Sequence, residues 1–110
     1  MQTAAHLTHV MKTLADPTRR AVFERIMSER EVTAGSLVAR SRVSQPAVSQ
    51  HLRALRDAGL VSERKEGRHI HYRVRREGFE PLVNWMDRWS IFWNERFDNL
   101  EQYLKETSRE

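Results

Sequence analysis

The feature that most constrains the fold is an aromatic face near the end of the chain. From about residue 81 to about residue 105, apolar side chains recur at helical spacing and fall within an arc of roughly 140° on a helical wheel. This arc contains Leu82, Trp85, Met86, Trp89, Phe92, Trp93, Phe97, Leu100, Tyr103 and Leu104. Such a helix spans about 37 Å, longer than the body of a small domain, so part of the face needs cover from elsewhere. We expect that cover to be a second copy of the chain.

The length of 110 residues predicts one domain, residues 1–110, with a single modest core. We expect an amphipathic helix over about residues 3–14 to join the dimer, together with a dimerisation helix at residues 81–106. The predicted dimer contacts are Leu7, Val10, Met11, Trp85, Trp89, Phe92, Trp93, Arg96, Phe97 and Leu100. Arg96 lies inside the apolar arc, so we expect it to meet a carboxylate or a carbonyl across the dimer, or to reach the edge of the face.

Several classes of protein are excluded by what the sequence lacks. It contains no cysteine, which rules out disulfides, thiolate nucleophiles and thiolate metal sites. No segment approaches the roughly 18 apolar residues of a membrane span, and the first residues lack the pattern of a signal peptide. We therefore expect a cytoplasmic protein with no membrane partner, and we expect no cofactor.

Basic residues are concentrated in the middle third of the chain. Residues 1–39 carry 5 basic and 4 acidic groups, residues 40–76 carry 10 and 3, and residues 77–110 carry 4 and 8, so the balances are +1, +7 and −4. This distribution favours a polyanion such as nucleic acid as the partner of the middle third. A solvated basic surface is the alternative that charge alone leaves open.

Capping signals divide the first part of the chain into helices. Asp16 followed by Pro17 predicts a helix start, because Asp can cap free N–H groups while Pro occupies the first helical position. The apolar spacing carries this second helix to about Ser28. Thr33 is expected to cap a third, short helix that ends at Arg40.

The segment SQPAVSQHLRALRDAGLV, residues 44–61, predicts a helix with two different faces. Ser44 is its natural cap, Pro46 is tolerated in its first turn, and Gly59 supplies the left-handed residue after its end. With the short helix before it, this helix forms a predicted recognition unit at residues 33–58. The centre of its apolar face is formed by Val48, Leu52 and Leu55.

The opposite face of that helix is polar, with short side chains near its start and longer basic ones further on. A helix in the major groove of DNA needs this arrangement, because bases are close to its N-terminus and phosphates are reached further along. The predicted DNA contacts on this helix and just before it are Arg42, Ser44, Gln45, Ser49, Gln50, His51, Arg53 and Arg56. An ordinary amphipathic surface helix is the alternative, and His51, at the border of the two faces, could instead be a packing residue.

Residues 60–75 predict a β-hairpin with a basic tip, which would be the wing of a winged helix. Two runs with partial period-two alternation flank a turn around Glu66 and Gly67. Ile70, Tyr72 and Val74 are expected to face the core. Arg64, Lys65 and Arg68 flank the turn, where a wing meets the DNA backbone or the minor groove. A solvated charged turn is the alternative.

The order of the predicted elements indicates a mainly α fold with a small β-hairpin, a winged helix-turn-helix with N- and C-terminal dimerisation helices. The segments LADPTRRAVFERI (residues 14–26), SQPAVSQHLRALRDAGLV (residues 44–61) and GRHIHYRV (residues 67–74) closely resemble the ArsR-type winged helix-turn-helix repressors of bacteria and archaea. The resemblance covers most of residues 5–75. It implies a homodimer that binds a roughly palindromic operator in double-stranded DNA and blocks transcription. We expect no enzymatic activity.

The metal sensors of that family have no obvious counterpart here. Many relatives sense metals through paired cysteines, but the corresponding stretch EVTAGSL, residues 31–37, has Thr and Gly where thiolates would stand. Others use histidines on the last helix, and no histidine follows His71. The pairs His6 with His9 and His69 with His71 each supply only two ligands. We expect no metal at the known family sites, while a weak site between subunits and a small-molecule or metal effector stay open.

The two alternatives to DNA binding are an enzyme and a protein-assembly module. A metal-dependent hydrolase built on the histidines lacks any acid, base or nucleophile at a plausible spacing. A winged-helix module for protein assembly would recruit a partner through the aromatic face and use the basic third only for solubility. Salt-dependent binding to DNA separates this module from a transcriptional regulator.

Overall fold

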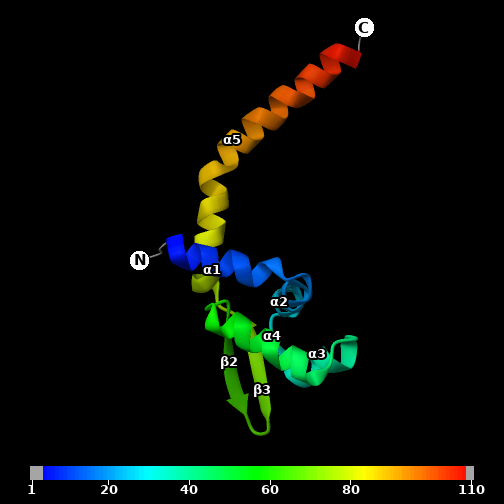
Figure 1. The fold of residues 1–110 in the computed structure, drawn as a ribbon, viewed down its shortest axis with the longest axis vertical. Coiled ribbons are helices and arrows are strands. Elements are labelled where there is room, and N and C mark those ends of the chain that lie inside the picture. The colour runs from blue at the N-terminus through cyan, green and yellow to red at the C-terminus, as the bar shows by residue number, and fades with distance from the viewer. Residues whose placement is uncertain (1–3, 109–110) are drawn as a thin grey trace.

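A computed structural model describes residues 4–108 as a winged body from which one long helix projects (Figure 1). The elements are α1 (Ala4–Ala15), α2 (Pro17–Glu29), β1 (Val32–Thr33), α3 (Ala34–Arg40), α4 (Gln45–Asp57), β2 (Val61–Glu66), β3 (His69–Val74) and α5 (Arg76–Ser108). Over these residues the chain forms five helices and a three-stranded sheet in the order β1-β3-β2. The predicted fold class, mainly α with a small β element in a winged helix-turn-helix, is confirmed.

The starts of three helices follow from the capping residues. The predicted caps before α2, α3 and α4 all accept a backbone N–H from the first turn of their helix, which satisfies a donor that the helix itself leaves unpaired. These bonds are Arg19 N–H to Asp16 Oδ1 at 2.9 Å, Ser36 N–H to Thr33 Oγ1 at 3.1 Å and Ala47 N–H to Ser44 Oγ at 3.3 Å. Pro17 and Pro46 lie in the first turns that their missing N–H groups suit.

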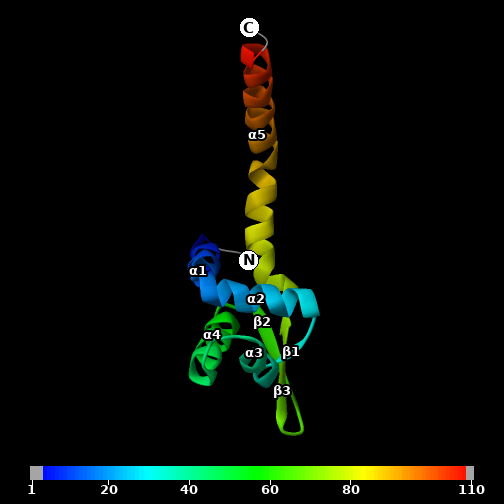
Figure 2. The ribbon, with the colours of Figure 1, turned by 90° about the vertical axis from the view of Figure 1, so that its right-hand side faces the viewer.

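The core lies where α2, α3 and α4 meet the sheet, with α1 across the top. α1 and α4 lie on the same side of the body, to the left of the sheet in Figure 2. The buried apolar side chains are Val10, Val22, Phe23, Ile26, Val32, Leu37, Val48, Leu52, Leu55, Ala58, Leu60, Val61 and Tyr72. The Phe23 ring meets Phe79 of α5 at 5.6 Å between centroids, so the base of the long helix is part of this core.

The prediction that Val10 contacts a dimer partner is wrong. Its side chain is 0% exposed in the single chain and belongs to the core under α1. The helical spacing correctly groups Val10 with Leu7 and Met11, but it does not separate the residues that face the chain's own interior from those at the margin of the stripe. Leu7 and Met11 are only partly buried and keep surface to offer.

The sheet has one strand more than the predicted hairpin. β1 pairs antiparallel with β3, so that Val32 lies opposite Tyr72 and Thr33 opposite His71. β2 pairs with the other edge of β3, from Val61 opposite Val74 to Glu66 opposite His69. A strand of two residues is too short to show period-two alternation in a sequence, which is why β1 escapes prediction.

α5 begins at Arg76, five residues before the predicted start near Pro81, and runs for 33 residues or about 50 Å. The predicted start rested on where the apolar spacing becomes regular, whereas the helix extends back through Pro81, whose missing N–H removes only one backbone donor near the helix start. Over residues 4–108, no helix is apolar over a length that could cross a membrane. The longest dimension of the molecule is 66 Å, and most of α5 stands clear of the body (Figure 1).

Two glycines let the end of α4 and the start of α5 come into direct backbone contact. Gly59 has φ +76° after the end of α4, with hydrogen bonds from Gly59 N–H to Arg56 O at 2.9 Å and from Leu60 N–H to Leu55 O at 2.9 Å. This is a Schellman ending, which needs a left-handed residue. A Cβ on Gly78, in the first turn of α5, would lie 1.7 Å from the Gly59 carbonyl oxygen. The backbones therefore touch, and any side chain at position 78 would separate them.

We expect Gly78→Ala to destabilise the protein by about 2 kcal/mol or more, because overpacking at a rigid backbone contact forces the helix to shift. Gly35→Ala is the matched control, since a Cβ there comes no closer than 4.0 Å to Thr33 Oγ1. Alanine at this helical position should be neutral or stabilising by up to about 1 kcal/mol. Urea unfolding at one protein concentration measures both. Equal stability of Gly78→Ala and the parent would contradict the close contact.

Candidate nucleic-acid interface

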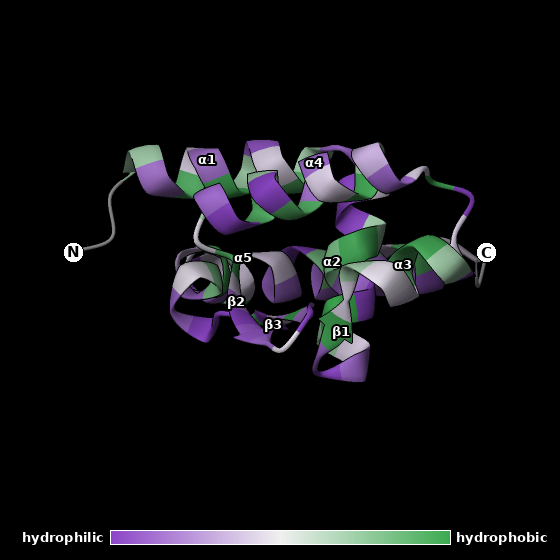
Figure 3. Cartoon of the chain, turned by 90° about the horizontal axis from the view of Figure 1, so that it is seen from below, coloured by the Kyte–Doolittle hydropathy of each residue, from purple (hydrophilic) through white to green (hydrophobic). Residues whose placement is uncertain are grey.

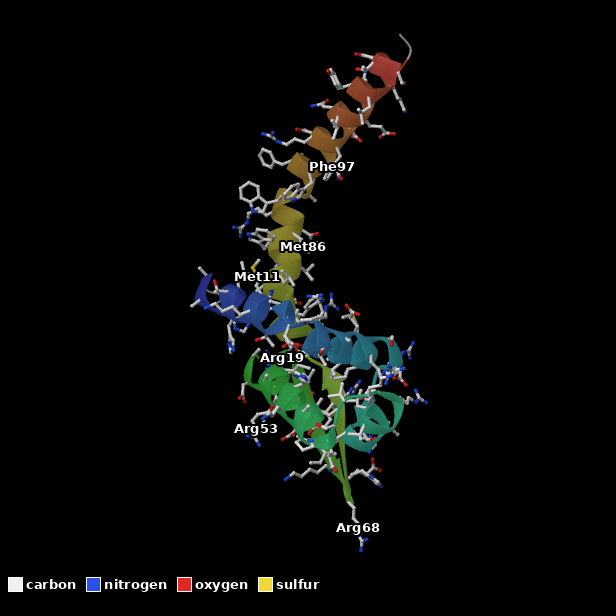
Figure 4. The ribbon with its side chains drawn as sticks, turned by 45° about the vertical axis from the view of Figure 1, so that its right-hand side comes forward. Met11, Arg19, Arg53, Arg68, Met86 and Phe97 are labelled. Atoms are coloured by element: carbon white, nitrogen blue, oxygen red, sulfur yellow. The ribbon has the colours of Figure 1, made fainter. Side chains whose placement is uncertain are left out.

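The polar face of α4 points away from the body. Val48, Leu52 and Leu55 are buried against the core, which fixes the rotation of the helix. The opposite side is exposed at Ser44, Gln45, Ser49, Gln50, Arg53 and Arg56. Arg53 extends outward from the helix (Figure 4). Six of the predicted contacts are thus brought together on one open surface.

Four cations at or near this surface are free of carboxylates. Within residues 4–108, no ion pair involves Arg42, Arg53, Lys65 or Arg68. Arg68 lies at the tip of the hairpin, at the far end of the body from α5 (Figure 4). Both wing strands are largely hydrophilic when the molecule is seen from below (Figure 3). Unpaired cations of this kind can bind phosphates without first breaking an internal pair.

A groove of about 340 Å³ separates α4 from the wing. Its helix side carries Ser49, Leu52, Arg53 and Arg56, and its wing side carries Glu63, Lys65, Ile70 and Tyr72. The strand register explains this lining, because Glu63 lies opposite Tyr72 and Lys65 opposite Ile70, and side chains two residues apart share a face. The predicted core residues Ile70, Tyr72 and Val74 are all at least partly buried, with Tyr72 packed most deeply.

Glu63 is a residue of this groove that the sequence reasoning missed. Arg56 Nη1 donates to Glu63 Oε1 at 3.1 Å. Arg56, a predicted DNA contact, is therefore paired within the chain. A weaker approach joins Arg56 Nη2 to Asp57 Oδ1 at 3.7 Å. Burial, and then the negative charge of Glu63, raise the pKa of Tyr72. The pairing of the two strands of the hairpin puts Glu63 opposite Tyr72. This pairing is the sequence signal that could have identified Glu63 as a residue of the groove.

Arg64 does not share the face of the wing that meets α4. Its guanidinium donates to Glu66 at 2.7 Å and to Glu31, just before β1, at 2.6 Å. These bonds fasten the wing to the first strand. His71 lies in the same cluster, with Nδ1 3.4 Å from Glu31 and Nε2 3.7 Å from Glu66. Arg64 therefore has a structural role in the free protein, which its place in the sequence did not reveal.

The hydrogen bond from Arg64 holds the pKa of the Glu66 carboxyl below its usual range. The carboxylates of Glu66 and Glu31 in turn raise the pKa of Arg64. Because the folded pKa of Glu66 is lowered, the pair stabilises the fold above the ordinary carboxyl pKa of 4.5. That contribution is lost as the pH falls through the lowered pKa. At neutral pH the ion pair between Arg64 and Glu66 therefore persists.

His51 lies on the α2 side of α4, where it is half-buried. The backbone N–H of Arg19, and less strongly the charge of His51, hold the pKa of Asp16 below its usual range. Within the described chain, His51 Nδ1 and Arg19 Nε are buried atoms without a hydrogen-bond partner. The structure therefore places His51 between helices and apart from the open face of α4.

The aromatic face of α5 is exposed along most of its length. The large apolar side chains on it that are exposed include Met86, Trp89, Phe92, Trp93, Phe97, Leu100, Tyr103 and Leu104. Trp85 is partly buried, and Arg96 is exposed within the stripe. α1 packs against the base of α5, and Met11 and Met86 lie on these two helices (Figure 4). A continuous apolar face of this size marks an interaction surface.

No metal centre is formed by the part of the chain that the structure covers. Over residues 4–108, no group of three His, Cys, Asp or Glu side chains is arranged to hold a metal ion. His69 and His71 lie on one face of β3. The neighbours of His71 are Glu31 and Glu66, the two carboxylates that bind Arg64.

Comparisons with known proteins agree with this geometry. A family described as a helix-turn-helix domain matches residues 14–64. The chain is 30% identical to the transcriptional repressor SdpR of Bacillus subtilis over 80 residues, covering 73% of this chain and 88% of the relative. It is 37% identical to the HTH-type transcriptional regulator Rv2034 of Mycobacterium tuberculosis over 91 residues, covering 83% and 81%.

A solved structure of an ArsR-like transcriptional regulator from Rhodococcus sp. RHA1 superposes with a TM-score of 0.70 at 32% identity. The superposition covers 89% of this chain and 92% of that one. Fold, sequence and the exposed face of α4 therefore lead to one assignment: the chain belongs to the ArsR family of winged helix-turn-helix DNA-binding transcriptional regulators.

Proposed function

We propose that two copies of this chain form a homodimer that binds a roughly palindromic operator and represses transcription. The observation that carries the proposal is the outward polar face of α4 beside a basic wing. A metal-dependent hydrolase gains no support from this arrangement, because residues 4–108 contain no group of three His, Cys, Asp or Glu side chains placed to hold a metal ion.

Base reading is assigned to the N-terminal half of α4. Gln45 and Ser49 are short or medium side chains on its first two turns, and both are exposed. Such groups reach base edges when a recognition helix enters the major groove with its N-terminus first. Arg53 follows one turn later and can reach either a guanine or a phosphate. Ser44, Gln50 and Arg42 complete the proposed contact surface at the start of the helix.

Backbone contacts are assigned to the wing. Lys65 faces the groove beside α4, while Arg68 projects from the hairpin tip. Lys and Arg at these positions neutralise phosphates, and an arginine at the tip can enter the minor groove. Arg64 is excluded from this set in the free protein by its bonds to Glu31 and Glu66.

The dimer is assigned to α5 together with α1. A second copy of the chain presents the same aromatic stripe, so two such faces cover each other in a symmetric pair. This contact would bury Trp89, Phe92, Trp93 and Phe97, whose exposure in a single chain is otherwise costly. Arg96 then needs an acceptor from the partner or an exit at the edge of the seam. The covered face would also leave the body and wing of each copy free.

A symmetric pair of recognition helices fits two half-sites separated by about one DNA turn. A dimer on such an operator blocks the polymerase sterically, and the names of the relatives, which include a transcriptional repressor, support this direction of control. A cytoplasmic location is part of the same proposal. The alternative, a protein-assembly module, predicts no salt-dependent binding to duplex DNA.

Gln45→Ala should change base preference, whereas Lys65→Gln should weaken binding to all sequences alike. Loss of a base contact costs about 1–3 kcal/mol at the cognate site, while loss of one phosphate contact reduces the slope of log affinity against log salt by about 0.9. Fluorescence anisotropy with operator and random-sequence duplexes at several salt concentrations measures both effects. If both variants changed operator and random duplex equally, base reading by α4 would be contradicted.

Trp89→Asp should split the dimer and weaken operator binding by about a hundredfold or more, because the two half-sites would no longer be bound by linked helices. Ile91→Asp is the matched control, since Ile91 is 66% exposed on the opposite side of α5 and Trp89 is 41% exposed. Sedimentation velocity and operator titration compare the two. A monomeric Trp89→Asp protein that keeps full operator affinity would contradict the proposed dimer.

A further inference from the structure

The groove between α4 and the wing holds a charge of the wrong sign for a DNA-binding surface. Of the described residues that line it, Glu63 alone is acidic, and its neighbours include Arg53, Arg56 and Lys65. Its side chain is 30% exposed, so its carboxylate is neither buried away nor free in solvent.

Glu63 is already bound to a cation of the proposed DNA face. Arg56 Nη1 donates to Glu63 Oε1 at 3.1 Å. Tyr72, directly opposite Glu63 on β3, forms the floor of the groove on the wing side. The partner of Arg56 is therefore held by the sheet, while Arg56 itself comes from the last turn of the recognition helix. The pair bridges the two elements that would hold DNA.

If the proposed function is right, a DNA strand would pass along this groove, and the role of Glu63 rests on that function. With α4 in the major groove and the wing on the neighbouring backbone or minor groove, the sugar-phosphate strand between them lies over the gap. A phosphate offers a guanidinium the same paired oxygen acceptors as a carboxylate. Arg56 thus has two competing partners, one inside the chain and one on the DNA.

We propose that Glu63 is an internal competitor of DNA phosphate for Arg56 and lowers the part of DNA affinity that is independent of sequence. In the free protein the pair neutralises Arg56. In the complex, either the pair breaks, which costs its interaction energy, or it persists, and Arg56 contributes no phosphate contact. Both outcomes reduce the electrostatic attraction that every duplex shares.

The consequence is a regulator that depends more on base contacts than its basic charge suggests. Phosphate contacts add equally to operator and random DNA, and a chromosome offers far more random sites than operators. Arg64 is also paired, but on the other face of the wing, and two carboxylates hold it. Arg56 has a single close partner. Of the two arginines that line the groove, Arg56 is therefore the one whose availability a close carboxylate controls.

Glu63→Gln tests this inference, with a fluorescein-labelled random-sequence duplex as the probe and affinity measured across a salt series. We expect its affinity to rise about threefold to tenfold, the scale of one exposed ion pair and one added phosphate contact. The salt slope should steepen by about 0.9. Adding Arg56→Gln to this variant should remove both changes.

Glu66→Gln is the matched control, because it removes the same charge from the same strand on the face away from α4 and leaves Arg64 bonded to Glu31. Its effect should stay below twofold. Equal gains from Glu63→Gln and Glu66→Gln, no gain from Glu63→Gln, or a gain that persists without Arg56 would overturn the inference alone. If the unmodified protein failed to bind any duplex at low salt, the proposed function would fall, and this inference with it.

Discussion

The contact between the backbones of Gly59 and Gly78 is the constraint on which the rest of the architecture depends. Gly59 ends the recognition helix with a positive φ, and Gly78 lets the first turn of α5 lie directly on that ending. Arg75 N–H also donates to Leu60 O at 2.8 Å, which fastens the end of β3 to the same corner. The helix proposed to read DNA and the helix proposed to form the dimer are thus held in direct backbone contact.

The contact between Gly59 and Gly78 couples the helix proposed to form the dimer to the helix proposed to bind DNA. Because α4 and α5 meet backbone to backbone, the position of one fixes the position of the other within each chain. In the proposed dimer, pairing of the aromatic stripes would therefore set the separation and tilt of two recognition helices. A site built in this way can discriminate operator spacing without any contact to the bases between the half-sites.

The body and the projecting helix carry charge of opposite sign. The body carries the basic middle of the chain, while residues 77–110 have a balance of −4. An acidic projecting helix would repel DNA and would direct it toward the proposed contact surface on α4 and the wing. Within that basic surface the carboxylates of Glu31, Glu63 and Glu66 hold particular arginines. Only some of the basic side chains on this surface are therefore free of ion pairs, and net charge alone does not identify which ones.

The sequence predicts most of the fold because its local signals are strong and agree with one another. Caps at Asp16, Thr33 and Ser44 satisfy backbone donors locally, so their helix starts can be found without knowing the tertiary structure. The apolar centre of α4 likewise sets which face points outward. Features that escaped prediction depend on contacts between distant parts of the chain. β1 exists only because β3 lies beside it, and Arg64 pairs with Glu31 across 33 residues of sequence, which no helical wheel represents. Val10 was misplaced for the same reason, since periodicity groups residues by face but does not say which neighbour covers each one.

The most direct measurement of the central claim is hydroxyl-radical footprinting on an operator selected from genomic fragments, with the number of bound chains counted by native mass spectrometry. If the outward face of α4 reads DNA in a pair of linked chains, two protected segments should appear about one turn, or roughly 10 base pairs, apart. Two chains should be bound at each operator. A single protected segment occupied by one chain would contradict the account.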